Sequence, residues 1–459
     1  MDTAKQLLDA QRPLEALDRL KKLLSTVDAS DEWRIHELIG AAFHDLANPA
    51  GAAQAYFNAA RTDKFLRSQR AHFSNWIFAL HYLPHVDAET LDNELAIYNS
   101  LFRDVEPLDT VARRGEKISV AFIAPNFCDS SAARFYEPLL TDFDRDKFTV
   151  TAWSLSAEED AFTRKIRRNV DAYTDISETS FEESAIKIRD AGCDVLVDLG
   201  GHTEGGATLQ VAAYKPCRVQ VTAVGYFDST GLDAIDYFVG DEFLTAGAHF
   251  TEKILSLENA FAFRPNEQMI QARSQRRPFP HALTFGCLNN FMKLSDDYLT
   301  AVAKILDAVP DAQIIFRDTT PLASRQRALV ERLKTFGIER AQVRRGADNF
   351  FTDYSEIDLI LDAFPYPGGL MTALALYMKV PVLNLRGELA SSRTGADILR
   401  IANVDELIVA DVDAFIAAAI DLAHNRAKLS ALTEKISVDK MTDTNGFVAD
   451  FYAKLSEVI

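Results

Sequence analysis

Short apolar runs alternate with stretches of helical spacing over most of this 459-residue chain, and this pattern constrains the fold more than any other feature. The runs are rich in Val, Ile, Leu and Phe and end at turn signals, as in KISVAFIAP (117–125) and CDVLVDLGG (193–201). Strands that are apolar on both faces and alternate with helices are typical of parallel sheets covered by helices on both sides. The sequence therefore predicts an α/β architecture with doubly wound, parallel sheets.

This alternation occurs in two blocks. The first spans residues 113–263 and the second spans residues 282–420, and we predict a Rossmann-like domain from each. Residues 264–281 between them are polar, basic and flanked by proline, which indicates a linker. Open parallel sheets bind ligands at the carboxyl ends of their strands, so two such domains predict a ligand-binding cleft between them.

Segments of helical spacing flank the two α/β blocks. Residues 1–112 contain RPLEALDRLKKLLS (12–25) and NPAGAAQAYFNAAR (48–61), which superpose at an offset of 36, close to the period of tetratricopeptide helical pairs. We predict an all-helical, tetratricopeptide-like N-terminal domain, with a generic helical bundle as the alternative. Residues 421–459 also have helical spacing, and we expect them to pack back on the core.

The composition disfavours several classes of partner and location. Lys and Arg total 49 against 67 Asp and Glu, and the net charge of −18 repels nucleic acid and anionic lipid surfaces. No apolar run approaches the roughly 20 residues of a membrane span, and the first residues lack a signal-peptide pattern. The four cysteines form no C-x-x-C pair. We therefore expect a cytoplasmic protein with no membrane span and no nucleic-acid partner.

The most informative loop follows the apolar run that ends at Asp362. Gly368 and Gly369 stand in this loop, directly before a helical segment that contains Met371 and Thr372. Two glycines let a ligand approach bare backbone N–H groups, and the helix dipole favours an anion at the N-terminus. A diphosphate fits such a site. A tight turn that needs glycine only for its geometry is the alternative.

Lys293 lies in a second loop of the same domain, which also contains Asn289 and Asn290. A flexible ammonium in that loop can reach the same anion, although a solvated lysine is the ordinary alternative. The D-x-D pairs of the chain lie in acidic turns away from the glycine loops, and no P-loop or G-x-G-x-x-G fingerprint occurs. We therefore predict no metal site and no redox cofactor.

The first α/β block carries a glycine-rich loop of its own. Asp198, His202 and Glu204 lie there among four glycines, just after an apolar run. We expect this loop to face the cleft, where the three side chains would orient an acceptor or remove a proton. A histidine held by a neighbouring carbonyl is the alternative for His202.

Several longer motifs follow one another in a characteristic order. They are FSNWIFALHYLP (73–84), VAFIAPNF (120–127), DVLVDLGGHTEGG (194–206), FGCLNNFMKLS (285–295), DLILDAFPYPGG (358–369) and RGELASSRTGADILR (386–400). In this order the chain resembles the O-linked N-acetylglucosamine transferase family, in particular its bacterial soluble protein glycosyltransferases. The resemblance implies a GT-B fold, a nucleotide-sugar held mainly by the second α/β domain, and metal-independent inverting transfer to a protein.

The resemblance also assigns roles to particular residues. Lys293 matches the family lysine that contacts the donor diphosphate, and Gly368 and Gly369 lie at the anion-binding helix start. Ser130, Phe350 and Gly369 stand where the family usually has histidines. The resemblance therefore leaves the catalytic base unassigned.

These inferences lead to one principal hypothesis of function. We expect an inverting transferase that moves a sugar from a nucleotide donor, UDP-linked by the resemblance, to Ser or Thr of a bacterial protein such as flagellin or a surface adhesin. The candidate catalytic residues are Lys293, His202, Asp198 and Glu204, and the candidate donor-binding residues are Asn289, Asn290, Lys293, Gly368, Gly369, Met371 and Thr372. We expect the N-terminal helices to dock the acceptor. A non-catalytic recruiter and a nucleotide-sugar epimerase are the alternatives.

Overall fold

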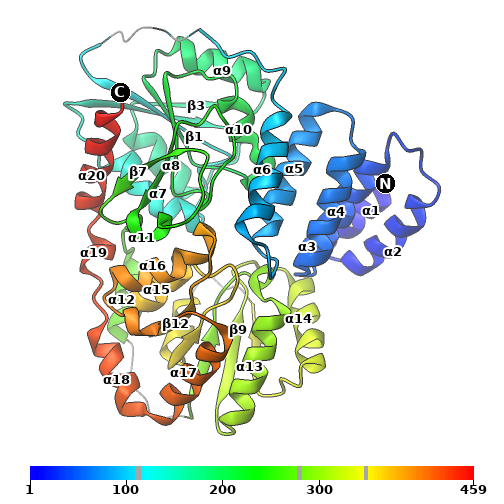
Figure 1. Cartoon of the computed structure of the whole chain (residues 1–459), viewed down its shortest axis with the longest axis vertical. Helices are drawn as coiled ribbons and strands as arrows, with labels where there is room; N and C mark the ends of the chain where they lie inside the picture. The colour runs from blue at the N-terminus through cyan, green and yellow to red at the C-terminus, as the bar shows by residue number, and fades with distance from the viewer. Residues whose placement is uncertain (110, 112–114, 276–281, 346–349) are drawn as a thin grey trace.

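The computed structural model describes residues 1–109, 111, 115–275, 282–345 and 350–459. Two α/β domains lie one above the other, and the N-terminal helices pack against their side (Figure 1). Each α/β domain contains one wholly parallel sheet, so the predicted fold class is confirmed. The predicted domain boundary at residue 113 lies outside the described residues.

The N-terminal part consists of antiparallel helical pairs. Its helices are α1 (Asp2–Asp9), α2 (Pro13–Leu24), α3 (Glu32–His44), α4 (Pro49–Thr62), α5 (Leu66–Leu80) and α6 (Ala88–Ser100). Pro13 and Pro49 open α2 and α4, where a missing N–H group costs nothing. Ala16 and Ala52 are fully buried, and a Cβ on Gly40 would lie 2.5 Å from the Tyr56 ring, so small residues permit the close helix packing.

The first α/β domain has a sheet of seven parallel strands. In chain order they are β1 (Ile118–Ala124), β2 (Phe148–Ser154), β3 (Ala172–Asp175), β4 (Val195–Asp198), β5 (Val219–Thr222), β6 (Tyr237–Asp241) and β7 (Lys253–Leu257). The spatial order is β3-β2-β1-β4-β5-β6-β7. Its helices are α7 (Ser131–Thr141), α8 (Ala161–Asn169), α9 (Phe181–Asp190), η1 (Thr203–Gly206), α10 (Ala207–Ala212) and α11 (Glu242–Thr245).

The second α/β domain has six parallel strands in the order β10-β9-β8-β11-β12-β13. They are β8 (Thr284–Cys287), β9 (Gln313–Arg317), β10 (Ala341–Arg344), β11 (Leu359–Leu361), β12 (Val382–Leu385) and β13 (Ile408–Val409). The strand order reverses between β8 and β11, and ligands bind parallel sheets at such a reversal. Its helices are η2 (Phe291–Lys293), α13 (Asp296–Ala308), α14 (Ala323–Thr335), η3 (Phe350–Ser355), α15 (Leu370–Tyr377), η4 (Ala390–Arg393), α16 (Thr394–Ile401) and η5 (Asp405–Leu407).

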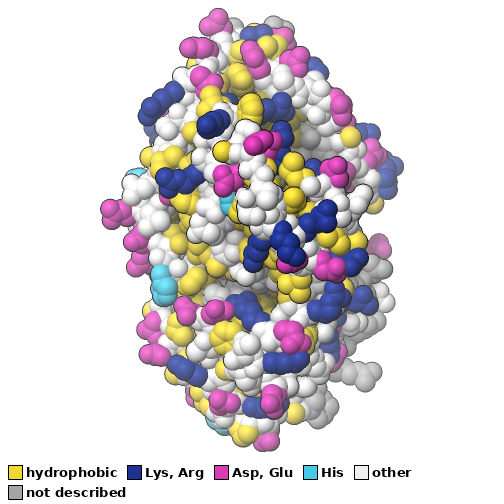
Figure 2. Space-filling model, turned by 90° about the vertical axis from the view of Figure 1, so that its right-hand side faces the viewer, with side chains coloured by type: hydrophobic (Ala, Val, Ile, Leu, Met, Phe, Trp, Pro, Cys, Tyr) yellow, Lys and Arg dark blue, Asp and Glu magenta, His cyan; other side chains and the backbone are white. Residues whose placement is uncertain are grey.

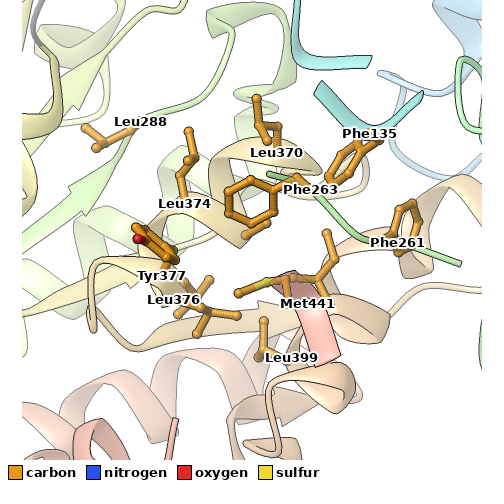
Figure 3. Packing of buried hydrophobic residues seen from close by; sticks show 14 of the residues in the cluster. Phe135, Phe261, Phe263, Leu288, Leu370, Leu374, Leu376, Tyr377, Leu399 and Met441 are labelled. Atoms are coloured by element: carbon orange, nitrogen blue, oxygen red, sulfur yellow. The ribbon is translucent and has the colours of Figure 1, made fainter. Parts of the chain in front are cut away.

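The segment predicted as a linker differs from our expectation. Residues Glu267–Gln275 form a helix, α12, because Asn266 accepts a hydrogen bond from the Met269 N–H group and Met269 is buried in the core. Residues 276–281 of the predicted linker lie outside the described part of the chain. An apolar seam beside α12 joins the two domains, with Phe135, Phe261 and Phe263 packing near Leu370 and Tyr377 (Figure 3).

The C-terminal helices return to the first domain. They are α17 (Val412–His424), α18 (Arg426–Lys435), α19 (Asp439–Thr442) and α20 (Thr444–Glu457). Helix α20 runs along the first domain (Figure 1), where the Tyr452 ring lies 4.5 Å from the Phe148 ring and its hydroxyl donates a 2.7 Å hydrogen bond to the Leu139 carbonyl. None of the helices in the described ranges combines the length and apolar character that a membrane crossing requires.

Candidate functional site

Lys293 lies where the second sheet reverses its strand order. It ends η2, the turn after β8, and its Nζ donates a 2.5 Å hydrogen bond to the carbonyl of Pro367 in the loop after β11. The same Nζ lies 4.0 Å from the centre of the Tyr366 ring, a cation–π geometry. Burial lowers the pKa of Lys293 to about 8, against the opposing effect of the nearby Asp362 carboxylate. The ammonium is therefore charged at pH 7 and poorly hydrated, which favours an incoming anion.

The loop after β11 is built around the carboxylate of Asp362, which is fully buried. Its oxygens accept hydrogen bonds from five neutral donors, namely the amides of Asn289 and Asn384, the Thr372 hydroxyl and the N–H groups of Ala363 and Gly368. Such bonds stabilise the buried carboxylate, together with the nearby Lys293 ammonium. Asp362 therefore ties together the loops after β8 and β11 and the first turn of α15.

The glycines of this loop have different roles. A Cβ on Gly368 would lie 2.4 Å from the Thr372 hydroxyl, so this position needs glycine for the Asp362 network to form. A Cβ on Gly369 would meet nothing closer than 3.8 Å. Within the described residues, no side chain caps the N-terminus of α15. Its first N–H groups therefore remain available for an anion, with the favourable end of the helix dipole behind them.

Several predicted donor-binding residues are already occupied by contacts inside the protein. The amide of Asn289, the Thr372 hydroxyl and the Gly368 N–H group all donate to Asp362. Asn290 accepts from the Met292 N–H group and from Arg325. The structure thus gives these four residues positioning roles. Direct contact between them and the donor stays a prediction.

A cavity of about 450 Å³ lies between the two α/β domains. It is bounded by Ser130 and Arg134 at the start of α7, by Arg317 and Asp318 at the end of β9, and by Met371 in α15. Ser130 caps α7 by accepting a 3.1 Å hydrogen bond from the Ala133 N–H group. The volume falls in the range of sites that hold small molecules. Met371 therefore lines this cavity, and its contact with the donor stays a prediction.

The glycine-rich loop after β4 faces the N-terminal helices, and our expectation that it faces the cleft is wrong. His202 is fully buried. Its Nδ1 accepts a 2.7 Å hydrogen bond from the Ser74 hydroxyl of α5, and its Nε2 donates a 2.9 Å bond to the Thr230 carbonyl. Burial lowers the pKa of His202 to about 3, so the ring stays neutral. His202 therefore joins α5 to the first domain and cannot reach an acceptor.

Asp198 is also enclosed, and it accepts hydrogen bonds from the N–H groups of Gly200 and Gly201 and from the Thr222 hydroxyl. Burial raises the pKa of this carboxyl group. The glycines serve packing here, because a Cβ on Gly206, whose φ is +62°, would lie 2.3 Å from the Ser74 hydroxyl. Of the three predicted side chains in this loop, only Glu204 is exposed.

A buried polar cluster at the meeting point of all three parts was missed by sequence reasoning. His81, directly after α5, bonds the Tyr226 hydroxyl at 2.6 Å and the Ser391 hydroxyl at 2.9 Å. Asp228 accepts a 3.2 Å bond from the Ser391 N–H group. The Tyr366 ring, which lies beneath the Lys293 ammonium, is 5.9 Å from the His81 ring. The only signal for this cluster was that His81, Tyr366 and Ser391 occur within the ordered motifs quoted above.

Several known proteins are similar to this chain. The family model described as glycosyl transferase family 41 matches residues 103–277. A curated relative from Arabidopsis thaliana, named a probable UDP-N-acetylglucosamine–peptide N-acetylglucosaminyltransferase SPINDLY, is 29% identical over 331 residues, which cover 69% of this chain and 36% of the relative. Its namesake from Hordeum vulgare is 27% identical over 332 residues, covering 69% and 35%. The chain thus spans little more than a third of these relatives, at 36% and 35% of their lengths.

Solved structures share the fold. An O-GlcNAc transferase mutant from Thermobaculum terrenum superposes with a TM-score of 0.86 at 24% identity, over 97% of this chain and 87% of that chain. A glycosyltransferase from Rickettsia africae gives a TM-score of 0.52 at 11% identity, over 75% and 99%. The two facing parallel-sheet domains form a GT-B fold, as in these structures, and residues 103–277 of the chain are similar to glycosyl transferase family 41.

Proposed function

We propose that this chain is an inverting glycosyltransferase that moves a sugar from a nucleotide diphosphate donor, UDP-linked in the first instance, to Ser or Thr of a protein. One observation carries the proposal: Lys293 Nζ and the uncapped N-terminus of α15 lie together at the reversal point of the second sheet, within the described residues. Attack at the anomeric carbon makes the diphosphate leave as an anion. Preorganised donors at that position lower the barrier most effectively.

The donor site supports metal-independent chemistry, and we include metal independence in the proposal. A lysine ammonium and a helix N-terminus together supply the positive potential that a diphosphate needs. Isothermal calorimetry with UDP in excess EDTA tests this point. We expect binding with unchanged affinity after EDTA treatment, whereas binding that appears only on addition of Mg²⁺ or Mn²⁺ would contradict it.

The acceptor is a protein in this proposal, with bacterial flagellin or a surface adhesin as the first candidates by family analogy. Glu204 is retained as a candidate for orienting the acceptor, because its carboxylate is exposed. All four cysteines are free, which suits the reducing cytoplasm that we propose as the location. A second function, non-catalytic recruitment of a protein to a partner transferase, is favoured by one observation, the enclosure of His202 and Asp198.

A groove of about 900 Å³ separates the N-terminal helices from α13 and α14. Leu14, Pro49 and Phe336 line it, and it reaches Ser295 and Asp296 at the start of α13, next to the Lys293 turn. Figure 2 shows this side of the molecule, where hydrophobic side chains gather among Lys and Arg around a central hollow. We propose that the acceptor docks here. The N-terminal helices would then supply affinity that the sugar site lacks.

Leu14→Glu tests this docking surface. Leu14 is 69% exposed, so the substitution should leave the fold and the affinity for UDP unchanged. The KM for the acceptor protein should rise about tenfold, the effect of failing to bury one leucine side chain. Leu66→Glu is the matched control, because Leu66 is also exposed and does not line the groove. Equal KM values for the two variants would show that the acceptor docks elsewhere.

The pKa of Lys293 predicts how the affinity for UDP depends on pH. The folded-state pKa of about 8 lies below the ordinary value of 10.5, because burial disfavours the charged form. A diphosphate binds the ammonium form, so affinity should be level below pH 8 and fall above it, by about tenfold between pH 7 and 9. Calorimetry in buffers of different ionisation enthalpy measures the affinity and the proton uptake together. Lys293→Arg stays charged, so its affinity for UDP should not change over this pH range. A wild-type affinity that is also independent of pH would show that the Lys293 ammonium does not bind the diphosphate.

A further inference from the structure

Arg325 is the largest fully buried side chain among the described residues, with an exposure of 0%. It lies in the first turn of α14, on the side that meets the N-terminal helices. A guanidinium cannot lose its charge inside a protein, so burial is tolerated only where carbonyl, amide or carboxylate oxygens satisfy its N–H groups. The identity of those acceptors therefore shows which segments Arg325 holds together.

The acceptors of Arg325 come from three separate segments. Its Nε donates a 3.0 Å hydrogen bond to the carbonyl of His44, and an Nη lies 2.9 Å from the ring nitrogen of the same residue. The other Nη donates to the side-chain oxygens of Asn290, at 2.9 Å, and Thr320, at 3.1 Å. Asp318 lies 3.7 Å away as the counter-ion. Arg325 thus joins the end of α3 to the loops after β8 and β9.

Asn290 carries this connection to Lys293. Its side-chain oxygen, which Arg325 holds, also accepts a 3.0 Å hydrogen bond from the Met292 N–H group. Its backbone carbonyl accepts a 2.9 Å bond from the Lys293 N–H group. On the opposite side, the preceding residue Asn289 is bound to Asp362. The turn that presents Lys293 is therefore fixed from two directions, and one of them begins in the N-terminal helices.

The end of α3 also gains from the contact. His44 is the last residue of this helix, and the final carbonyls of a helix lack partners within it. A cation at this position interacts favourably with the helix dipole. The same guanidinium thus holds the end of α3 in place and orders the loop after β8. Loss of its contact with one of them therefore weakens its contact with the other.

We propose that Arg325 is a positioning residue that couples the N-terminal helices to the Lys293 turn, so that the donor site is fully ordered only while the end of α3 is docked. The effect of this coupling on donor binding rests on the function proposed above, whereas the coupling between α3 and the Lys293 turn does not. A protein that binds in the groove against the N-terminal helices would then act on Lys293 through Arg325. The alternative is that the contacts of Arg325 stabilise the fold and leave the Lys293 turn unaffected.

Residue-resolved hydrogen exchange of the ligand-free, full-length protein tests the coupling. Arg325→Lys keeps the charge, but one ammonium cannot span His44, Asn290 and Thr320. We expect amide exchange at residues 291–294 to become at least about tenfold faster, the scale of losing a hydrogen bond to a charged group. Lys334→Met is the matched control, because Lys334 is an exposed cation on the same helix. Unchanged exchange at residues 291–294 in Arg325→Lys would overturn the proposal.

A second pair of variants covers the case in which Arg325→Lys does not fold. Asn290→Ala removes the acceptor that Arg325 holds and should give the same fast exchange. Asn290→Asp keeps an acceptor oxygen and should retain slow exchange. Equal exchange rates at residues 291–294 in these two variants would contradict a role for the Arg325 contact.

The effect of UDP on amide exchange separates this coupling from contacts that only stabilise the fold. In the wild-type protein, saturating UDP should slow exchange both at residues 291–294 and in the last turn of α3, residues 41–44. In Arg325→Lys it should slow exchange only at residues 291–294. Equal protection of α3 in both proteins would overturn the coupling. Absence of any UDP effect at residues 291–294 in the wild type would instead contradict the proposed function, and the ligand-free comparison would still decide the role of Arg325.

Discussion

Lys293→Ala should lower the turnover of sugar transfer by on the order of 10²–10³, the loss observed when one preorganised donor to a developing charge is removed. The Lys293 ammonium faces the Pro367 carbonyl and the Tyr366 ring beside the uncapped start of α15. An arriving diphosphate would replace the carbonyl as its partner. The expected loss is therefore in turnover, and it is measured by steady-state kinetics with donor and acceptor at saturation.

The fold should survive this substitution. Lys293 is only partly buried and ends a short turn, so its removal leaves no large cavity. Lys304→Ala is the matched control, because Lys304 is an exposed lysine on α13, the helix that follows. Near-wild-type turnover of Lys293→Ala, at an unchanged melting temperature, would show that Lys293 does not stabilise the leaving diphosphate.

Asp362→Ala should have the second large effect, on both stability and donor binding. Five buried donors lose their acceptor in this variant. Each unsatisfied buried polar group costs about 1–3 kcal/mol, so the free energy of unfolding should fall by at least about 3 kcal/mol. The affinity for UDP should fall by at least about 100-fold, because the glycine loop and the Asn289 side of the Lys293 turn lose their common anchor.

Urea denaturation and UDP calorimetry below the unfolding range measure these two effects. Asp311→Ala removes an exposed aspartate from the same domain and should change neither quantity. Asp362→Asn keeps one acceptor oxygen. Its free energy of unfolding and its affinity for UDP should therefore lie between those of Asp362→Ala and Asp311→Ala. Unchanged UDP affinity in folded Asp362→Ala would mean that the Asp362 network does not shape the donor site.

The fold was largely predictable because its signals are local. Apolar runs such as that of β1 can be buried only between two helical layers, and Pro13 and Pro49 mark the starts of α2 and α4. Helix α12 was missed because Met269 is the apolar residue that it buries in the core, whereas the neighbouring Ile270 is exposed. One buried side chain gives no periodicity to detect.

The candidate site was predictable only in part. Lys293 and the glycine loop follow strands that are neighbours in the sheet, so their proximity follows from the topology. His202 was misjudged because a glycine-rich loop indicates close packing without showing which partner packs there, and the partner here is α5. Arg325 gave no signal at all, since an arginine in a helical segment is ordinarily exposed. Its burial depends on His44, which is remote in the sequence.

Intact-mass analysis of candidate acceptor proteins, incubated with a panel of nucleotide-sugars and this protein in EDTA, tests the central claim most directly. We predict that at least one acceptor gains the mass of a single sugar residue or a multiple of it, with release of the nucleotide diphosphate. Lys293→Ala should give little or no gain under the same conditions, and Lys304→Ala should match the wild type. Tight UDP binding without any gain of acceptor mass, or conversion of the donor without an acceptor, would contradict transfer to protein.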